Sequence, residues 1–284
     1  MPNTITNLNR TLTSGIIVRA QRVLICLDTA QNDPSPLATH DLSTSLRRLL
    51  VSHQVTSQLF NWKLFRKYNR SQIQKFRLQL GAMRDIQEMS LKVQALQPAS
   101  SATQSFVNQL AKQETTARPV LIAAIKDFDR SSVLSLGQLN SEQSHFQSTP
   151  ISSIKMFLLK HFEKVAALYQ SAVTERNDEA IHQMRVRYKR LRYSIELLAP
   201  VLANVAHEKL LYLRTFQQVM GEAHDWLIID KAIKEFALNT NQTEFDQLVL
   251  TIEQLRFEAH QKAREYLTAE WDNLQFLISS ITFK

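Results

Sequence analysis

The stretch His182–Arg192 reads HQMRVRYKRLR and combines an apolar pattern with a cationic one. Its apolar residues recur every three or four positions, which predicts a helix with one buried face. The cationic side chains share a separate face at i, i+3, i+7 and i+10, and they are His182, Arg185, Lys189 and Arg192. Like charges at this spacing repel one another by a few tenths of a kcal/mol per pair, so an extended polyanion would stabilise the stripe. Arginine forks suit phosphate oxygens, so the stretch points to phosphate binding, with a solvated helix face as the alternative.

A degenerate copy of this stretch lies in the first half of the chain. Residues 40–50 read HDLSTSLRRLL and align with it without gaps, so that His40 matches His182. About forty residues after each copy follows a short signature, LGAMRD at 80–85 and MGEAHD at 220–225. The offsets of the two anchors are 142 and 140 residues, which indicates an internal duplication. Each half would then contain about four helices, the size of a helical bundle.

Helical periodicity continues along nearly the whole chain and predicts an all-α fold. The expected helices cover residues 8–27, 38–66, 69–96, 104–129, 151–172, 177–198, 205–238 and 242–281. The Ser- and Gln-rich stretch 131–150 is the predicted linker. It would divide one domain over 1–284 into halves 1–130 and 151–284.

Composition excludes several common classes of protein. The chain has 284 residues but only four glycines and seven prolines, too few for β-sandwiches, barrels or nucleotide-binding α/β folds. One cysteine excludes an internal disulfide, and the eight histidines show no metal-ligand spacing, so no metal site and no cofactor are expected. The N-terminus does not resemble a signal peptide, and no apolar run could span a membrane, so a cytoplasmic protein is expected.

Charge is segregated along the sequence. The net charge is +8, yet residues 42–84 contain no acidic residue and carry +9 by themselves. A second acid-free run, 182–193, carries +5. A solvated surface mixes the two signs, so the two runs indicate an anionic partner.

Several side chains near the two signatures have candidate roles. Cationic neighbours should lower the pKa of the motif histidines, and a bound phosphate should raise it. Gly81 and Gly221 would sit inside helices, which suggests close approach of another helix. Asp85 and Asp225 are interpreted as structural partners of arginines on the motif helix, because no second carboxylate or histidine can be placed beside them for acid–base work.

HxxRVxxxRLR on a helix, its degenerate copy and the two LGxxRD-like signatures resemble the CHAD family, the conserved histidine α-helical domain. The resemblance covers essentially the whole chain. It implies two pseudo-symmetric four-helix bundles around a basic central cavity or channel. It also implies non-catalytic binding of inorganic polyphosphate, with polyphosphate granules as a candidate location. The phosphate-facing residues that it implies are His40, Arg47, Arg48, His182, Arg185, Lys189, Arg190 and Arg192.

Further cations are expected as companions of this set. Arg77 and Arg84 share a helix face with one signature. The helices that precede each motif add four weaker candidates, namely Arg19, Arg22, Lys160 and Lys164. The first copy departs from the pattern, since Ser43 and Leu50 stand where the second copy has arginines. Weaker binding by that half is expected unless Arg66 or Lys67 compensates.

Two rival functions use the same charges. A helical nucleic-acid-binding protein is the main alternative, although the sequence shows no recognised nucleic-acid motif and no regularly spaced stacking aromatics. A phosphate-ester hydrolase is the other, and it lacks a visible carboxylate cluster for Mg²⁺. No ExExK signature of a triphosphate-processing domain is present, so no catalytic residue is predicted.

Overall fold

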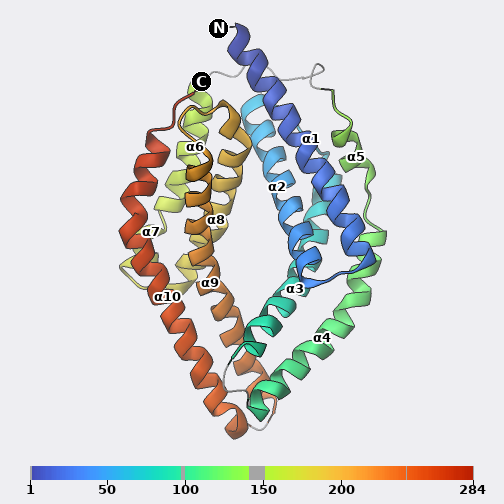
Figure 1. The fold of residues 1–284 in the computed structure, drawn as a ribbon, viewed down its shortest axis with the longest axis vertical. Helices are drawn as coiled ribbons and strands as arrows, with labels where there is room; N and C mark the ends of the chain where they lie inside the picture. Colours follow the sequence, from blue (N-terminus) through green and yellow to red (C-terminus); the bar gives the residue numbers. More distant parts are fainter. Residues whose placement is uncertain (1, 97–99, 141–150, 241, 284) are drawn as a thin grey trace.

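The computed structural model describes residues 2–96, 100–140, 151–240 and 242–283, and this part of the chain is almost entirely helical. The all-α prediction is therefore confirmed. The first five helices form one side of an elongated molecule and the last five form the other side (Figure 1). The helices are α1 (Pro2–Asn32), α2 (Pro36–Phe60), α3 (Lys67–Gln94), α4 (Ser101–Lys126), α5 (Ser131–Gly137), α6 (Ile151–Ala166), α7 (Tyr169–Val173), α8 (Asp178–Leu198), α9 (His207–Leu238) and α10 (Gln242–Ser279), with a 3₁₀ turn at Ala199–Val201.

The ends of the two motif helices follow from their flanking residues. The Ser35 hydroxyl accepts a hydrogen bond from the Ala38 amide and caps α2. The Asn177 side chain caps α8 by accepting from two backbone amides in the first turn. The predicted helix 38–66 ends earlier than expected, at Phe60, because Asn61 adopts a left-handed conformation with φ 50°. Asparagine tolerates this conformation, which terminates a helix.

The predicted linker begins with a helix. Residues 131–137 form α5, which packs along α1 and buries Val133 and Leu136. These two apolar residues stand three apart, so one turn of helix places both on the same face. Residues 141–150 of the predicted linker lie outside the described residues.

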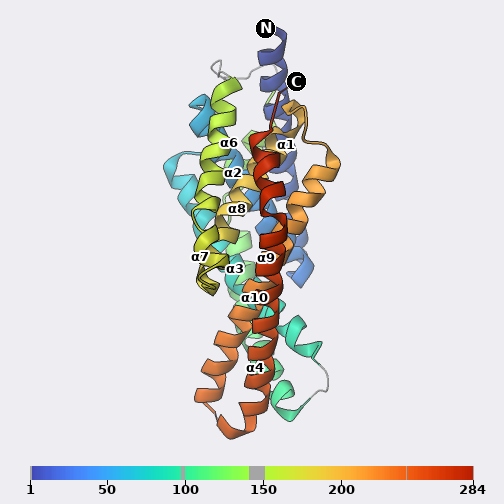
Figure 2. The ribbon, with the colours of Figure 1, turned by 90° about the vertical axis from the view of Figure 1, so that its left-hand side faces the viewer.

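Two apolar cores hold the helices together. The larger core contains residues from both sides of the molecule, and the buried Tyr188 and Phe216 rings stack within it. The smaller core joins α3 and α4 to α9 and α10 at the lower tip in Figure 1, through side chains such as Phe106 and Ile233. The two sides therefore touch at their tip and through the larger core. Figure 2 shows α10 running along the length of the molecule. In the ranges that the structure describes, no helix is long and apolar enough to cross a membrane.

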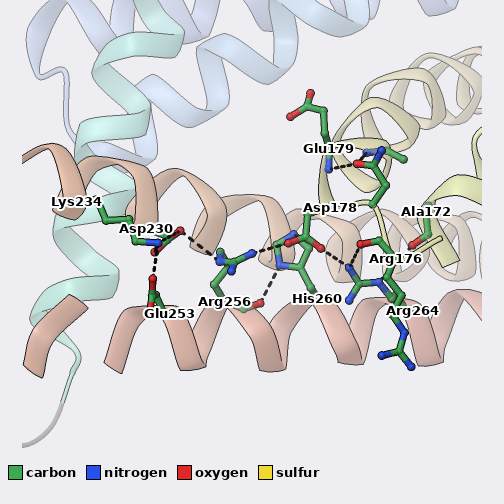
Figure 3. Close-up of polar contacts among 12 residues, drawn as sticks. Ala172, Arg176, Asp178, Glu179, Asp230, Lys234, Glu253, Arg256, His260 and Arg264 are labelled. Atoms are coloured by element: carbon green, nitrogen blue, oxygen red, sulfur yellow. Dashed lines mark hydrogen bonds and ion pairs between the residues drawn. The ribbon is translucent and has the colours of Figure 1, made fainter. Parts of the chain in front are cut away.

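A network of ion pairs fixes the first turn of α8, the helix that contains the motif (Figure 3). Asp178 pairs with Arg256 and Arg264 of α10, and the buried His260 lies 3.8 Å from the same carboxylate. Arg256 also approaches Asp230 of α9, with 3.3 Å between Nε and Oδ2. Charged partners from α9 and α10 thus anchor the end of the motif helix.

Candidate functional site

A pocket of about 790 Å³ lies where α2 and α3 face α8 and α9. We call it the interface pocket. Two carboxylates, Asp85 and Asp225, lie on its walls. Seven cationic side chains also line it, namely Arg47, Arg70, Arg77, Arg84, Arg185, Lys189 and Arg190. The cations exceed the carboxylates by five, so the pocket is strongly electropositive.

The two most buried cations of the pocket come from α8. Arg185 is 8% exposed and Lys189 is 7% exposed. The Arg185 Nε atom has no hydrogen-bond partner among the described residues, and its guanidinium lies 3.9 Å from the nearest oxygen of Asp225. Lys189 makes no ion pair or hydrogen bond within that part of the chain. Burying a charge without a full set of partners is costly, so these two positions are suited to an anion that enters from outside.

Burial and mutual repulsion both act on the pocket cations. Desolvation, followed by the charges of Arg185 and Arg47, lowers the pKa of Lys189 well below its ordinary value. Desolvation also lowers the pKa of Arg47 to about 10, with Arg77 and Arg84 adding to the effect. The pKa of Arg185 is lowered chiefly by desolvation and less by Arg84, while Asp225 opposes the shift. The arginines stay protonated at neutral pH, and the repulsion among them would be relieved by a polyanion.

Two histidines stack at the α8–α9 side of the pocket. The ring centroids of His182 and His224 lie 4.1 Å apart, and the Nδ1 atom of each lacks a hydrogen-bond partner in the described part of the chain. Desolvation lowers the pKa of His182, and desolvation followed by the charge of Arg185 lowers the pKa of His224 to about 2. Cationic neighbours therefore act in the expected direction, but burial is the larger cause. Neutral rings retain one N–H donor each for an anionic ligand.

Three of the expected phosphate ligands lie outside the pocket, in a compact ion-paired group. Arg192 pairs with Glu196 on the same helix, and the Arg48 Nε atom lies 3.4 Å from the same carboxylate. Arg19 donates hydrogen bonds to the Arg48 and Tyr193 carbonyls at 3.0 and 2.9 Å. We call these five residues the Glu196 cluster.

Helix geometry explains why Arg192 leaves the cationic stripe. It stands three residues beyond Lys189, about 4.5 Å further along the axis at a 1.5 Å rise per residue. At that level Glu196, four residues on, supplies a carboxylate on the same side of the helix. The stripe predicted at His182, Arg185, Lys189 and Arg192 is thus divided, and only its first three members line the pocket.

The remaining expected residues are spread over the surface around the pocket. His40 lies 3.7 Å from Glu88, and Arg22 pairs with Asp41 at 2.7 Å. None of these four residues lines the pocket. Three further cations, also outside its lining, are exposed, namely Arg66, Lys160 and Lys164.

Sequence reasoning missed one arginine and two histidines of the pocket, namely Arg70, His53 and His224. A signal for Arg70 exists, because residues 70, 77 and 84 follow at steps of seven and share one helix face. No comparable periodic signal identifies His224.

The two signature glycines do not mark close helix packing. A Cβ atom at Gly81 would meet no other atom within 4 Å, so the expected close approach is wrong there. A Cβ atom at Gly221 would lie 3.5 Å from the Arg185 Nε atom, an ordinary contact distance with a side chain of the motif helix. Of the two aspartates, Asp225 lies near Arg185 of the motif helix, as expected, and also near Lys92 of α3. Asp85 lines the pocket without an ion pair among the described residues.

Comparison with known proteins places this geometry in a family. The chain is similar over 98% of its length to the crystal structure of the CHAD domain from the plant Ricinus communis, with a TM-score of 0.69, 15% identity and 94% of that chain covered. It is similar to PptA from Streptomyces chartreusis, with a TM-score of 0.61 and 14% identity, over 94% of this chain and 99% of that one. At these identities the likeness shows the fold. No curated protein matches the sequence. The profile of the CHAD domain matches residues 20–234, which is more than half of the chain. This chain therefore belongs to the CHAD domain family.

Proposed function

We propose that the interface pocket binds inorganic polyphosphate and that the protein acts by binding rather than by catalysis. The observation that carries this proposal is the gathering of seven cationic side chains against two carboxylates in one pocket. Membership of the CHAD family supports it, because the resemblance read from the sequence implies the same ligand.

The chemistry of the ligand matches the chemistry of the walls. Polyphosphate presents a closely spaced row of negative charges without bulky groups. Arginine guanidinium groups bind phosphate oxygens in pairs of parallel hydrogen bonds, and Lys189 supplies a compact point charge. Binding would give Lys189 a partner that the described residues do not provide, and it would add one at the Nε atom of Arg185, whose guanidinium is 3.9 Å from Asp225. The free energy of binding would thus include relief of repulsion among the pocket cations.

The lining favours polyphosphate over nucleic acid, the alternative that the charges allow. Single-stranded nucleic acids bind proteins through bases stacked on aromatic side chains. Among the described lining residues there is no Phe, Tyr or Trp. The histidine stack joins two protein rings face to face and leaves no slot between them for a base.

The carboxylates of the pocket support a non-catalytic role. Asp225 lies within 4 Å of Lys92 and Arg185, so it balances charge inside the protein. Asp85 is the other carboxylate of the lining, and desolvation raises its pKa. A Mg²⁺-dependent phosphate hydrolase needs carboxylates that converge on the ion. Release of inorganic phosphate from polyphosphate by the purified protein, with and without Mg²⁺, would contradict this part of the proposal.

Two further expectations accompany the proposal. An internal duplication is supported by the order of the walls, since α2 is followed by α3 and α8 by α9, and both pairs line the pocket. The interface pocket is our candidate for the basic channel that the family resemblance implies. A cytoplasmic location, at polyphosphate granules, stays a prediction.

The test is a titration of the purified protein with long-chain polyphosphate at several salt concentrations, with double-stranded and single-stranded DNA as competitors. We expect polyphosphate to bind more tightly than either DNA. Electrostatic binding to a phosphate chain should weaken linearly on a log–log plot against salt, with a slope that follows the number of phosphates neutralised. Binding no tighter than that of DNA would overturn the assignment.

Matched variants test whether polyphosphate binds in the interface pocket. Arg47→Gln, Arg185→Gln and Lys189→Gln together remove three pocket charges, and each lost charge-assisted contact should cost about 1.5–3 kcal/mol of binding free energy. The control removes three exposed cations outside the lining, by Lys126→Gln, Arg187→Gln and Lys262→Gln. Both triple variants have the same net charge. Equal loss of affinity in both would show that only overall charge matters.

A further inference from the structure

The interface pocket is lined by residues of α2, α3, α8 and α9, and no described residue of α1 lines it. A second hollow of about 320 Å³ lies between α1, α2, α8 and α9, with Arg214 and His207 on its walls. The two cavities share no lining residue. Arg48 and Glu196 line the second hollow but not the pocket. Arg47 lines the pocket and the next residue, Arg48, lines the hollow, so the Glu196 cluster lies between two separate cavities.

This separation is made of well-packed side chains. Tyr193 is 2% exposed and Arg192 is 3% exposed. The guanidinium carbons of Arg192 and Arg48 lie 4.4 and 5.4 Å from the centre of the Tyr193 ring. Arg19 ties the group together by hydrogen bonds to backbone carbonyls of α2 and α8. A polyanion would have to break these ion pairs and hydrogen bonds to pass through.

Two of the pocket cations, Arg47 and Lys189, adjoin the Glu196 cluster along their helices. Arg47 is the chain neighbour of Arg48, and Lys189 precedes Tyr193 by about one helical turn. Arg84 and Arg185 are close enough to disfavour the charge of both Arg47 and Lys189. The strongest positive potential of the pocket is therefore expected where a linear ligand has to stop.

We propose that the pocket binds the end of a linear polyphosphate, with the terminal phosphate beside Arg47 and Lys189, rather than an internal segment of a chain that passes through. An ionised terminal phosphate carries about one more negative charge than an internal unit, as for other phosphate monoesters with a second pKa of about 6. The end of the chain thus brings the most charge to the position with the most cations. This inference rests on the proposed function and adds the part of the ligand that is recognised.

The deciding experiment is the stoichiometry of complexes with linear polyphosphate of defined, long chain length, measured by analytical ultracentrifugation with excess protein. If the pocket binds ends, each polyphosphate molecule binds one protein molecule at each end, whatever its length. If the pocket binds internal segments, the number of copies grows with chain length, and the inference is wrong while polyphosphate binding stands. If no complex forms, the proposed function itself fails.

A competition experiment tests the same point with short ligands. Linear triphosphate has ends, whereas cyclic tetrametaphosphate has none and carries a similar charge at neutral pH. We expect linear triphosphate to displace a labelled long chain at concentrations at least about tenfold lower, a difference of roughly 1.4 kcal/mol. Equal displacement by the ring would overturn end recognition.

A variant on the far side of the Glu196 cluster tests whether the bound polyphosphate ends inside the pocket. Arg214 is exposed and lines only the second hollow. The charge reversal Arg214→Glu should leave the affinity for long-chain polyphosphate unchanged within about twofold, because an end-bound chain does not reach it. A chain threaded through both cavities would meet the new carboxylate, so a tenfold loss of affinity would contradict the inference. Lys189→Gln, in the pocket, is the positive control and should weaken binding.

Discussion

The interface pocket and the Glu196 cluster contain the same kinds of side chain, but their cations differ in whether a carboxylate of the protein pairs with them. Arg47 and Arg48 are adjacent in α2, but Arg47 faces the pocket without an ion pair among the described residues, whereas Arg48 lies 3.4 Å from Glu196. Along α8, Lys189 is buried without a carboxylate, and Arg192 pairs with Glu196. Cations whose partners lie within the protein stabilise the fold, and cations without such partners are available to a ligand.

The network at the first turn of α8 belongs with the Glu196 cluster in this comparison. Arg256 and Arg264 both pair with Asp178, and Lys234 pairs with Asp230 and Glu253 (Figure 3). Cations and carboxylates pair closely at both ends of the motif helix, whereas between them Lys189 has no carboxylate and Arg185 has Asp225 only at 3.9 Å. The pattern along one helix therefore separates structural charges from the candidate binding site.

Glu196→Ala should give the largest effect, on stability. The substitution leaves Arg192, which is 3% exposed, and its neighbour Arg48 without their carboxylate. Removing one partner of a buried ion pair costs about 3–5 kcal/mol. The free energy of unfolding in urea should fall by an amount in this range. Glu222→Ala, at an exposed position without an ion pair among the described residues, is the control and should change it by less than about 0.5 kcal/mol.

If Glu196→Ala were as stable as the control, the Glu196 cluster would not be structural. The claim that paired cations stabilise the fold would then be wrong for this cluster.

The adjacent pair Arg47 and Arg48 should respond in opposite ways. Arg47→Gln should weaken polyphosphate binding by tenfold or more, since a hydrogen bond to a charged group is worth about 1.5–3 kcal/mol. Its stability should be unchanged or higher, because burial and repulsion already disfavour the charge. Arg48→Gln should lower the free energy of unfolding and leave the affinity nearly unchanged. Titration with polyphosphate and urea unfolding of the two variants provide the measurements, and matching losses of affinity would contradict the division.

The stacked histidines should make the folded protein less stable in acid. Burial lowers the pKa of His224 to about 2 in the folded protein, compared with about 6.5 when unfolded. Between these two values the unfolded chain binds the extra proton, so the stability contributed by neutral His224 is complete above pH 6.5 and falls as the pH decreases. For one proton the loss is at most about 1.4 kcal/mol per pH unit.

His224→Gln should therefore lose less stability than the native protein between pH 7 and pH 5 in urea unfolding experiments. His207→Gln changes an exposed histidine of the same helix and should keep the native pH dependence. Identical profiles for His224→Gln and the native protein would show that His224 is protonated with equal ease in both states.

Two glycines, Gly81 in the pocket lining and Gly15 in α1, should give the smallest effects. Gly81→Ala places a Cβ atom in open space, so it should raise the free energy of unfolding by up to about 1 kcal/mol, the helix preference of alanine over glycine. Gly15→Ala should gain less, because its Cβ atom would lie 2.9 Å from the Leu197 Cδ1 atom. Thermal unfolding of both variants tests this, and an equal gain would show that Leu197 moves away without cost.

The sequence by itself predicted much of the fold. Apolar residues at helical spacing predicted an all-α chain, since a helix repeats every 3.6 residues whatever it packs against. The end of α2 at Asn61 and the short helix α5 in the expected linker were missed, because both depend on a few local residues rather than on a long period. The family resemblance, carried by the motif at His182–Arg192, is confirmed by the match over residues 20–234.

The sequence also determined which residue types form the electropositive surface, because charge is a property of each side chain. Only the tertiary structure decided which cations keep their charge without a partner. Arg47 and Arg48 differ by one position and 100° around a helix, and that rotation turns one toward an open pocket and the other toward a carboxylate on α8. Pairing across helices depends on distances in space between residues that are far apart in the chain, and no period along the sequence encodes those distances.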